Sequence, residues 1–190
     1  MPDLHMMLDI ETMDTSKEAS VLSIGACMFD PRGANDYGKR AEDPITDTHY
    51  ERASLRSNLE AGRTMSADTI LWWMQQSEAA RFELHSGEQS PLGIALYNFR
   101  KWAVARDQVA TRIWAKSPDF DCVIMQDAMT KSAEMWPFKF WESRCVRTIT
   151  ELAYPEGDEP PLGIGVAHNA LDDSIRQALR VQECYRVLNC

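Results

Sequence analysis

The chain has 190 residues, of which 44% are hydrophobic and 26% charged, and this length and balance indicate one globular domain with its own core. Its formal net charge of −9 argues against a protein that coats nucleic acid by neutralising phosphates, but it does not exclude an enzyme whose acids hold divalent cations. The chain has no apolar run of about 18 residues, its first residues include acids, and its five cysteines form no CxxC pair. These features exclude a membrane span and predict a cytoplasmic protein with reduced thiols.

The first half of the chain begins with strand patterns. Residues 4–11 and 20–30 predict two strands joined by a polar loop, and a third short strand is expected near 49–54. One helix is expected at 66–84, because apolar residues recur there at the spacing of a single helical face, namely at Ala67, Ile70, Leu71 and Met74.

The second half alternates helices and strands. A helix is predicted at 92–106 and an apolar strand at 111–115, followed by a helix with Ser117 as its N-cap and Pro118 in its first turn. A loop rich in proline and glycine precedes the last helix, which is expected at 169–188. Strands first, and then strands alternating with helices, predict an α/β fold with a mixed central β-sheet flanked by α-helices.

Asp9 and Glu11 lie two residues apart at the end of the first predicted strand, so their side chains point to the same face of the sheet. Two adjacent carboxylates are costly to desolvate unless something positive lies between them. Taken alone, the pair fits a solvated strand end equally well.

Further acids stand at the starts of two predicted helices. Asp121 falls in the first turn of its helix, where the helix dipole favours any acid, and Asp119 meets that requirement as well. The stretch HNALDD at 168–173 offers Asn169 as a helix cap, followed by two adjacent acids. In this helix the apolar pattern alone makes Asp173 solvent-exposed. Each stretch is an ordinary helix entry when taken by itself.

Together, these acids and His168 form a set that suits metal chemistry. Carboxylate oxygens are hard ligands for two Mg²⁺ or Mn²⁺ ions, and no cysteine cluster points to zinc. Such a pair of ions can hold a phosphodiester and activate water. A neutral histidine beside them can take a proton near neutral pH.

The order of these motifs resembles that of the DEDD (DnaQ-like) 3′–5′ exonucleases of the ribonuclease H-like fold. It fits their DEDDh subgroup, which has a histidine in the third motif. The first motif is DIET at 9–12, the second is SPDFD at 117–121, and the third is HNALDD at 168–173.

The resemblance covers most of the chain, because the segments 69–81 and 136–152 look like the branch of phage exonucleases and bacterial exoribonucleases. The second motif departs from the pattern. Many relatives have Gly or Asn three residues before the Phe-Asp pair, whereas this chain has Ser117, followed by Pro118. Asp119 therefore competes for the role of Asp121, although the Phe-Asp pair favours Asp121.

The resemblance implies a single 3′–5′ exonuclease domain over residues 1–190 that uses two divalent cations, Mg²⁺ or Mn²⁺. Asp9 would bridge both ions, Glu11 and Asp173 would complete the site of the ion beside the nucleophile, and Asp121 would hold the second ion. His168 would act as the general base, and the product would be a nucleoside 5′-monophosphate released from a 3′ end.

The expected substrate-binding residues are Thr12, Met13, Trp72, Phe120 and Arg147. Thr12 and Met13 resemble family positions beside the 3′-terminal nucleotide, and Arg147 is a candidate phosphate contact. Trp72 fits stacking on the substrate and burial in a dimer interface equally well. Trp73 is expected in the core or in a subunit contact.

The expected partners are the 3′ ends of single-stranded DNA or RNA, with DNA favoured, and no membrane. The motifs do not decide between the two, because recognition of the 2′-hydroxyl depends on side chains that the sequence does not place. An exoribonuclease or oligoribonuclease of the same fold is one alternative. A catalytically silent nucleic-acid-binding module is another, although the complete set of acids argues against it. A homodimer is allowed, and the cytoplasm would be that of the host cell if the gene belongs to a phage.

Overall fold

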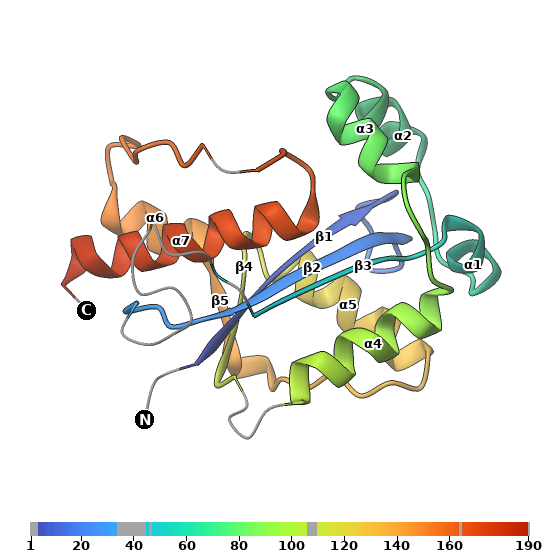
Figure 1. Ribbon diagram of the computed structural model, residues 1–190, viewed down its shortest axis with the longest axis horizontal. Helices are drawn as coiled ribbons and strands as arrows, with labels where there is room; N and C mark the ends of the chain where they lie inside the picture. Colours follow the sequence, from blue (N-terminus) through green and yellow to red (C-terminus); the bar gives the residue numbers. More distant parts are fainter. Residues whose placement is uncertain (1–3, 34–44, 46, 106–109, 164, 190) are drawn as a thin grey trace.

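The computed structural model describes residues 4–33, 45, 47–105, 110–163 and 165–189. Its centre is a five-stranded sheet in the order β3-β2-β1-β4-β5 (Figure 1). The strands are β1 (His5–Thr12), β2 (Val21–Phe29), β3 (Thr48–Arg52), β4 (Arg112–Ala115) and β5 (Ser143–Cys145). β2 is antiparallel to both β1 and β3, whereas β4 is parallel to both β1 and β5. The predicted mixed sheet is confirmed.

Helices cover both faces of this sheet. They are α1 (Leu55–Glu60), α2 (Ala67–Met74), α3 (Glu78–His85), α4 (Leu92–Val104), α5 (Asp121–Lys131), α6 (Val146–Ala153) and α7 (Ala170–Leu188), with a 3₁₀ turn at Phe140–Glu142. α6 and α7 lie on one face, and α4 and α5 on the other (Figure 1). None of the helices in the described part of the chain has the length and apolar character that crossing a membrane requires.

The central strand β1 serves both layers, because its side chains alternate between the two faces. Met6, Leu8 and Ile10 join the buried cluster on the α4 and α5 side. Met7 joins the cluster on the α7 side. Asp9 and Glu11 continue the row of Met7, so the two acids face the layer that contains α7.

The prediction of a single helix at 66–84 is wrong, because the structure has two helices, α2 and α3, separated at 75–77. Ser77 starts the second helix, since its side chain accepts a hydrogen bond from the backbone N–H of Ala80 at 3.2 Å. This local cap competes successfully with continuation of the first helix.

The apolar face predicted for this segment is wrong as well. Leu71 and Met74 are 56% and 63% exposed, whereas Trp73 is only 3% exposed. The Nε1 atom of Trp73 donates a hydrogen bond to the carbonyl of Thr12 at 2.9 Å. α2 therefore turns its buried side toward the end of β1, and Trp73 is the core residue that the sequence suggested.

The N-cap predicted for the helix after β4 is also wrong. α5 begins at Asp121 with Phe120 as its N-cap, and Ser117 to Phe120 form a turn in which the Ser117 carbonyl accepts from Phe120 N at 2.8 Å. The Ser117 hydroxyl instead accepts a hydrogen bond from Nε of Arg147 at 3.2 Å. The side chain of Ser117 therefore contacts a residue distant in the sequence, Arg147, and does not cap the helix.

Candidate active site

The two acids of β1 lie directly beneath the start of α7. Asp9 pairs across the sheet with Gly25 of β2. A Cβ atom added to Gly25 would lie 2.1 Å from the backbone of Ala170, the first residue of α7. Glycine is therefore required at this position, because it lets the helix backbone approach the sheet closely enough to bring residues 168–173 over β1.

Asp121 reaches the same place from the other side of β1. β1 pairs with β4 only over His5 to Met7, so the backbone N–H of Ile10 has no partner in β4. It donates instead to Oδ1 of Asp121 at 3.2 Å. The acid at the first position of α5 is thus fixed beside the strand that holds Asp9 and Glu11.

His168 and Asp173 complete the group at the start of α7. The backbone N–H of His168 donates to Oδ2 of Asp173 at 3.0 Å. Glu11, His168 and Asp173 each offer a ligand atom, and these atoms lie within 4.8 Å of one another. His168 has a φ of 64°, a left-handed conformation that is uncommon for residues other than glycine and is found repeatedly at functional sites.

Aromatic rings hold the imidazole of His168 in place. The ring of Trp72 meets it edge to face at a centroid distance of 5.0 Å, and that of Trp73 at 5.8 Å. Trp73 is in turn anchored to Thr12, next to the acids of β1. The two tryptophans therefore link α2 to the third motif, a contact that neither the apolar pattern nor the motif spacing indicates.

The electrostatics of the group are those of several buried like charges. Burial, followed by the charges of the three other acids, raises the pKa of Asp9 well above its ordinary value. Burial and the charges of Asp173 and Asp121 raise the pKa of Glu11 to about 8. Burial also raises the pKa of Asp121 to about 7, against the opposing effects of the Ile10 hydrogen bond and the Arg147 charge.

This set of donors fits divalent cations. Carboxylates that raise one another's pKa need positive charge between them to ionise together, and clustered carboxylate oxygens are the ligands that Mg²⁺ and Mn²⁺ prefer. Arg176 forms an ion pair with Asp173, and Gln177 donates to Oδ1 of Asp9 at 2.7 Å. Neither Arg176 nor Gln177 was among the residues that the sequence indicated.

The structure separates the two adjacent acids of the third motif. Asp173 belongs to the group with Glu11 and His168, although the apolar pattern made it solvent-exposed. Its side chain is 19% exposed. Asp172 points to the preceding loop, where its Oδ2 accepts from the backbone N–H of Val166 at 2.7 Å. Asn169 caps the helix as predicted, accepting from Leu171 N and Asp172 N.

A cavity of about 620 Å³ opens beside Glu11. Its lining includes Thr12, Trp72, Trp73 and Phe120, so three of the five expected substrate-binding residues share it. Met13 is not among its lining residues; its backbone instead bonds to Ser20 and Ser66. Trp72 is 42% exposed and borders both this cavity and His168. Arg147 does not line this cavity; its Nε donates to Oγ of Ser117 at 3.2 Å, and its charge acts on Asp121.

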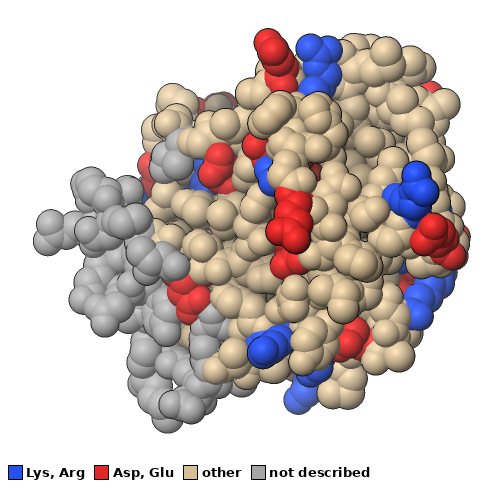
Figure 2. All heavy atoms as spheres, turned by 45° about the vertical axis from the view of Figure 1, so that its right-hand side comes forward, with Lys and Arg blue, Asp and Glu red and all other residues tan. Residues whose placement is uncertain are grey.

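The described part of the molecular face in Figure 2 shows no continuous basic area, since acidic and basic side chains are scattered among uncharged atoms. This agrees with the net charge of −9. Any polyanion that meets this face is therefore recognised through local contacts and not through a broad positive surface.

Comparison with known proteins shows that the chain matches one protein family and is similar in sequence to a phage exodeoxyribonuclease. Residues 4–185 match the family described as 3′-5′ exoribonuclease Rv2179c-like domain. The exodeoxyribonuclease of Enterobacteria phage T4 is 24% identical over 203 residues, which cover 95% of this chain and 88% of that protein.

Solved structures share the fold. The nuclease domain of 3′hExo, a DEDDh family member solved with bound rAMP, has a TM-score of 0.57 at 12% identity, covering 97% of this chain and 92% of that one. S. pombe Pop2p in its Mg²⁺- and Mn²⁺-bound form has a TM-score of 0.55 at 12% identity, covering 97% of this chain and 82% of that one. The predicted ribonuclease H-like fold is confirmed, and one of these solved structures, that of S. pombe Pop2p, contains Mg²⁺ and Mn²⁺.

Proposed function

Because this chain belongs to the 3′-5′ exoribonuclease Rv2179c-like domain family of DEDD (DnaQ-like) 3′–5′ exonucleases, we propose that it shortens single-stranded nucleic acid from the 3′ end. It would release nucleoside 5′-monophosphates, with Mg²⁺ or Mn²⁺ as cofactor. The observation that carries the proposal is the convergence of four acids from β1, α5 and α7 beside one histidine. We further propose that residues 1–190 act as a single exonuclease domain.

Asp9, Glu11, Asp121 and Asp173 are the residues that would hold two divalent cations. When bound, such ions position a phosphodiester and stabilise the charge that develops as it is cleaved. The role of the protein is to keep the four carboxylates in place before the ions arrive. Gln177 does this for Asp9, and the Ile10 N–H does it for Asp121.

His168 is proposed as the general base that takes a proton from the attacking water. A neutral imidazole accepts a proton near pH 7. Its orientation is set by the two tryptophan rings and by the backbone contact to Asp173. Trp72 would therefore contribute to the reaction by positioning His168 as well as by contacting the substrate.

The cavity lined by Thr12, Trp72 and Phe120 is proposed to hold the 3′-terminal nucleoside. It adjoins Glu11, so a nucleoside there would place its 5′-phosphate at the acids. An aromatic wall suits a base, because stacking on an aromatic ring is tolerant of base identity. This arrangement accounts for an exposed Trp72 without a subunit interface, and the homodimer stays a prediction.

Two candidate substrates remain, and each has an observation in its favour. Single-stranded DNA, which the sequence favoured, agrees with the name of the phage T4 exodeoxyribonuclease. Single-stranded RNA agrees with the description of the family that matches residues 4–185. The catalytically silent binding module is not proposed further, because the chain belongs to a family of exonucleases.

The proposal is tested with 5′-labelled single-stranded DNA and RNA of one sequence, incubated with Mg²⁺, Mn²⁺ or EDTA. We expect a ladder that shortens from the 3′ end with either metal and full-length strands in EDTA. The ratio of kcat/KM for the two strands then assigns the substrate. Internal cleavage, or shortening that persists in EDTA, would contradict the proposal.

A further inference from the structure

The start of α7 is joined to α3 by a contact that the proposed function leaves unused. The side chain of Asn169 has two ends with different partners. Its Oδ1 accepts from the backbone N–H groups of Leu171 and Asp172, both at 3.1 Å, and so caps the helix. Its Nδ2 donates to Oε2 of Glu83 at 2.9 Å. Glu83 therefore holds the residue that directly follows His168.

Glu83 is itself fixed by two donors from β3. Its Oε2 also accepts from the hydroxyl of Tyr50 at 3.0 Å and from Nη2 of Arg52. The side chains of Arg52 and Glu83 are 19% and 21% exposed, so salt screens this ion pair less than one on the open surface. Arg52 also lies over the ring of Tyr50, with its Cζ 5.1 Å from the ring centroid. The carboxylate of Glu83 is thus held on one side by β3 and meets Asn169 on the other.

Tyr50 connects this group to the acids of the site through the sheet. It pairs with Gly25 of β2, which in turn pairs with Asp9 of β1. Residues that pair directly across neighbouring strands point to the same face, so Tyr50 and Asp9 both face the layer that contains α7. Glu83 therefore ties the start of α7 to the row of the sheet that carries Asp9.

The charge of Glu83 determines which way the amide of Asn169 faces. Burial raises the pKa of Glu83, but the hydrogen bonds from Arg52 and Tyr50 outweigh burial, and the pKa lies below its ordinary value. An ionised carboxylate only accepts hydrogen bonds. It therefore selects the NH₂ end of the amide and leaves the oxygen end for the N–H groups of the helix. The cap and the link to α3 fix the same orientation of this side chain.

His168 depends on its neighbours, because its backbone lies in the left-handed region with a φ of 64°. A residue other than glycine keeps such a conformation only where the surrounding contacts impose it. The rings of Trp72 and Trp73 on α2 contact the imidazole. Glu83 on α3 acts on the backbone instead, by way of the side chain of Asn169. The two helices therefore support the ring and the backbone of His168 separately.

We propose that Glu83 is a positioning residue for the reaction and fixes the backbone of His168 through the side chain of Asn169. This inference rests on the proposed function, in which His168 takes a proton from the attacking water. Neither Glu83 nor Asn169 lines the cavity that adjoins Glu11, so the link acts on the chemical step and not on substrate binding. Without the link the imidazole leaves the geometry that proton transfer requires, and a displacement of about 1 Å is enough to cost about 100-fold in rate.

The test exchanges donor and acceptor across the link. Asn169→Asp keeps an oxygen that caps the helix, since aspartate and asparagine are similar caps, but it sets a second carboxylate against Glu83. Glu83→Gln alone sets an NH₂ group against the NH₂ group of Asn169 when its oxygen stays with the two donors of β3. In the double variant the new amide donates to the new carboxylate, and its oxygen still accepts from β3. Both changes preserve the size of the side chain, so the variants should fold.

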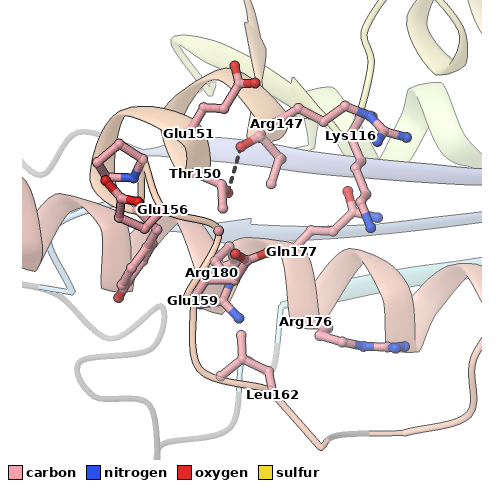
Figure 3. A pocket seen from close by; sticks show the side chains of 14 residues that line it. Lys116, Arg147, Thr150, Glu151, Glu156, Glu159, Leu162, Arg176, Gln177 and Arg180 are labelled. Atoms are coloured by element: carbon pink, nitrogen blue, oxygen red, sulfur yellow. Dashed lines mark hydrogen bonds between the residues drawn. The ribbon is translucent and has the colours of Figure 1, made fainter.

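Glu183 offers a matched control on the same helix. Its Oε2 accepts from Nη1 of Arg180 at 2.7 Å, and the side chains of Arg180 and Glu183 are 12% and 20% exposed. Arg180 lies over the ring of Tyr154 at 5.8 Å, so the control repeats the three residue types around Glu83. Arg180 lines the cavity of about 730 Å³ between α6 and α7 (Figure 3). Glu183 lies roughly 20 Å along the helix from Asn169, at about 1.5 Å per residue.

The readouts are kcat and KM on a 5′-labelled single-stranded oligonucleotide with Mg²⁺ or Mn²⁺. We expect each single variant of the link to lower kcat about 10- to 100-fold and to leave KM within about twofold. The double variant should recover kcat to within about threefold of the wild type, because the link is restored with donor and acceptor exchanged. Glu183→Gln should keep the wild-type kcat. Urea unfolding measures the stability of every variant, since a contact that only stabilises the fold would change stability and leave kcat unchanged.

Folded single variants with the wild-type kcat would overturn the positioning role of Glu83. A double variant no faster than the faster single variant would overturn it as well, and so would a rise in KM at unchanged kcat. In these cases the wild type still hydrolyses the strand, and the proposed function stands. Wild-type protein that hydrolyses no strand with Mg²⁺ or Mn²⁺ would instead overturn the proposed function, and this inference with it.

Discussion

At the scale of single residues, the acids of the site are held in a folded structure that does not favour their ionisation. The pKa of Glu11 is raised from an ordinary 4.5 to about 8, and that of Asp121 from 3.8 to about 7, both first of all by burial. The folded protein thus keeps protons that the unfolded chain has released at the same pH.

This difference predicts how stability depends on pH. The contribution of these acids to the free energy of unfolding is complete below about pH 4 and is lost as pH rises through about 8, because the raised pKa values belong to the folded state. We expect the metal-free melting temperature to fall across this range, and Mg²⁺ or Mn²⁺ to restore more at pH 8 than at pH 5. Melting in EDTA at several pH values measures this. Asp9→Asn, which removes one charge, should flatten the dependence, and a metal effect that is equal at both pH values would contradict the account.

The adjacent acids Asp172 and Asp173 should differ in their effects. Asp173→Asn should reduce kcat by more than about 100-fold, because even partners that only support metal ligands change activity about 10- to 100-fold. Asp172→Asn should keep substantial activity and lower stability by about 1 kcal/mol through its contact with Val166. Steady-state rates and urea unfolding of both variants test this pair. The opposite pattern of rates would move the ligand by one residue.

Trp72 has two expected roles, and one substitution addresses both. Trp72→Ala should raise KM about tenfold through lost stacking, and it should lower kcat because His168 loses an edge-to-face contact. Kinetics are measured together with the oligomer mass by light scattering. An unchanged KM with a shift from dimer to monomer would reject stacking and return Trp72 to a subunit interface.

At the scale of elements, the site depends on how closely α7 approaches β2. Gly25→Ala should destabilise the fold by about 1–3 kcal/mol, because the added methyl group meets the backbone of Ala170. It should also lower activity by displacing His168 and Asp173. Gly93→Ala in α4 is the matched control, because nothing lies within 4 Å of its added methyl group, and it should be neutral or stabilising by about 0.4–1 kcal/mol. Denaturant unfolding measures the free energy of unfolding of both variants. A Gly25→Ala protein as stable as the wild type would show that α7 can shift freely.

Some of the helices and strands can be predicted from the sequence, and others cannot. The strands with continuous apolar patterns and the long helices were predicted, because their signals are local. The break between α2 and α3 was missed, since it depends on the cap at Ser77 and on Trp73 reaching Thr12. α1, β5 and α6 were not predicted either; β5 has only three residues and exists through pairing with β4.

For the site, the motif residues could be found through a family resemblance, but their supports could not. Gln177 bonds to an acid 168 positions earlier in the chain, and Gly25 matters because of a helix that begins at Ala170. Such contacts leave no periodicity in the sequence. The helical pattern even indicated that Asp173 was solvent-exposed, because the pattern records apolar burial and not burial among acids.

At the scale of the whole molecule, a net charge of −9 and the scattered charges of Figure 2 set limits on substrate binding. Long-range attraction of a polyanion is weak in such a field. Under the proposed function, affinity has to come from the divalent cations and from the cavity that adjoins Glu11. We therefore expect substrate recognition to depend on residues close to Glu11, such as Thr12 and Trp72.

The central claim is that Asp9 and its neighbouring acids perform metal-dependent hydrolysis at a 3′ end, and Asp9→Asn tests it most directly. Wild type and variant are compared by their rates on 5′-labelled single-stranded DNA and RNA with Mg²⁺ or Mn²⁺, after circular dichroism has shown that both are folded. We predict that the wild type shortens at least one of the strands from its 3′ end and that the folded variant leaves both at full length. A folded Asp9→Asn protein that cleaves at the wild-type rate would contradict the assignment of the site.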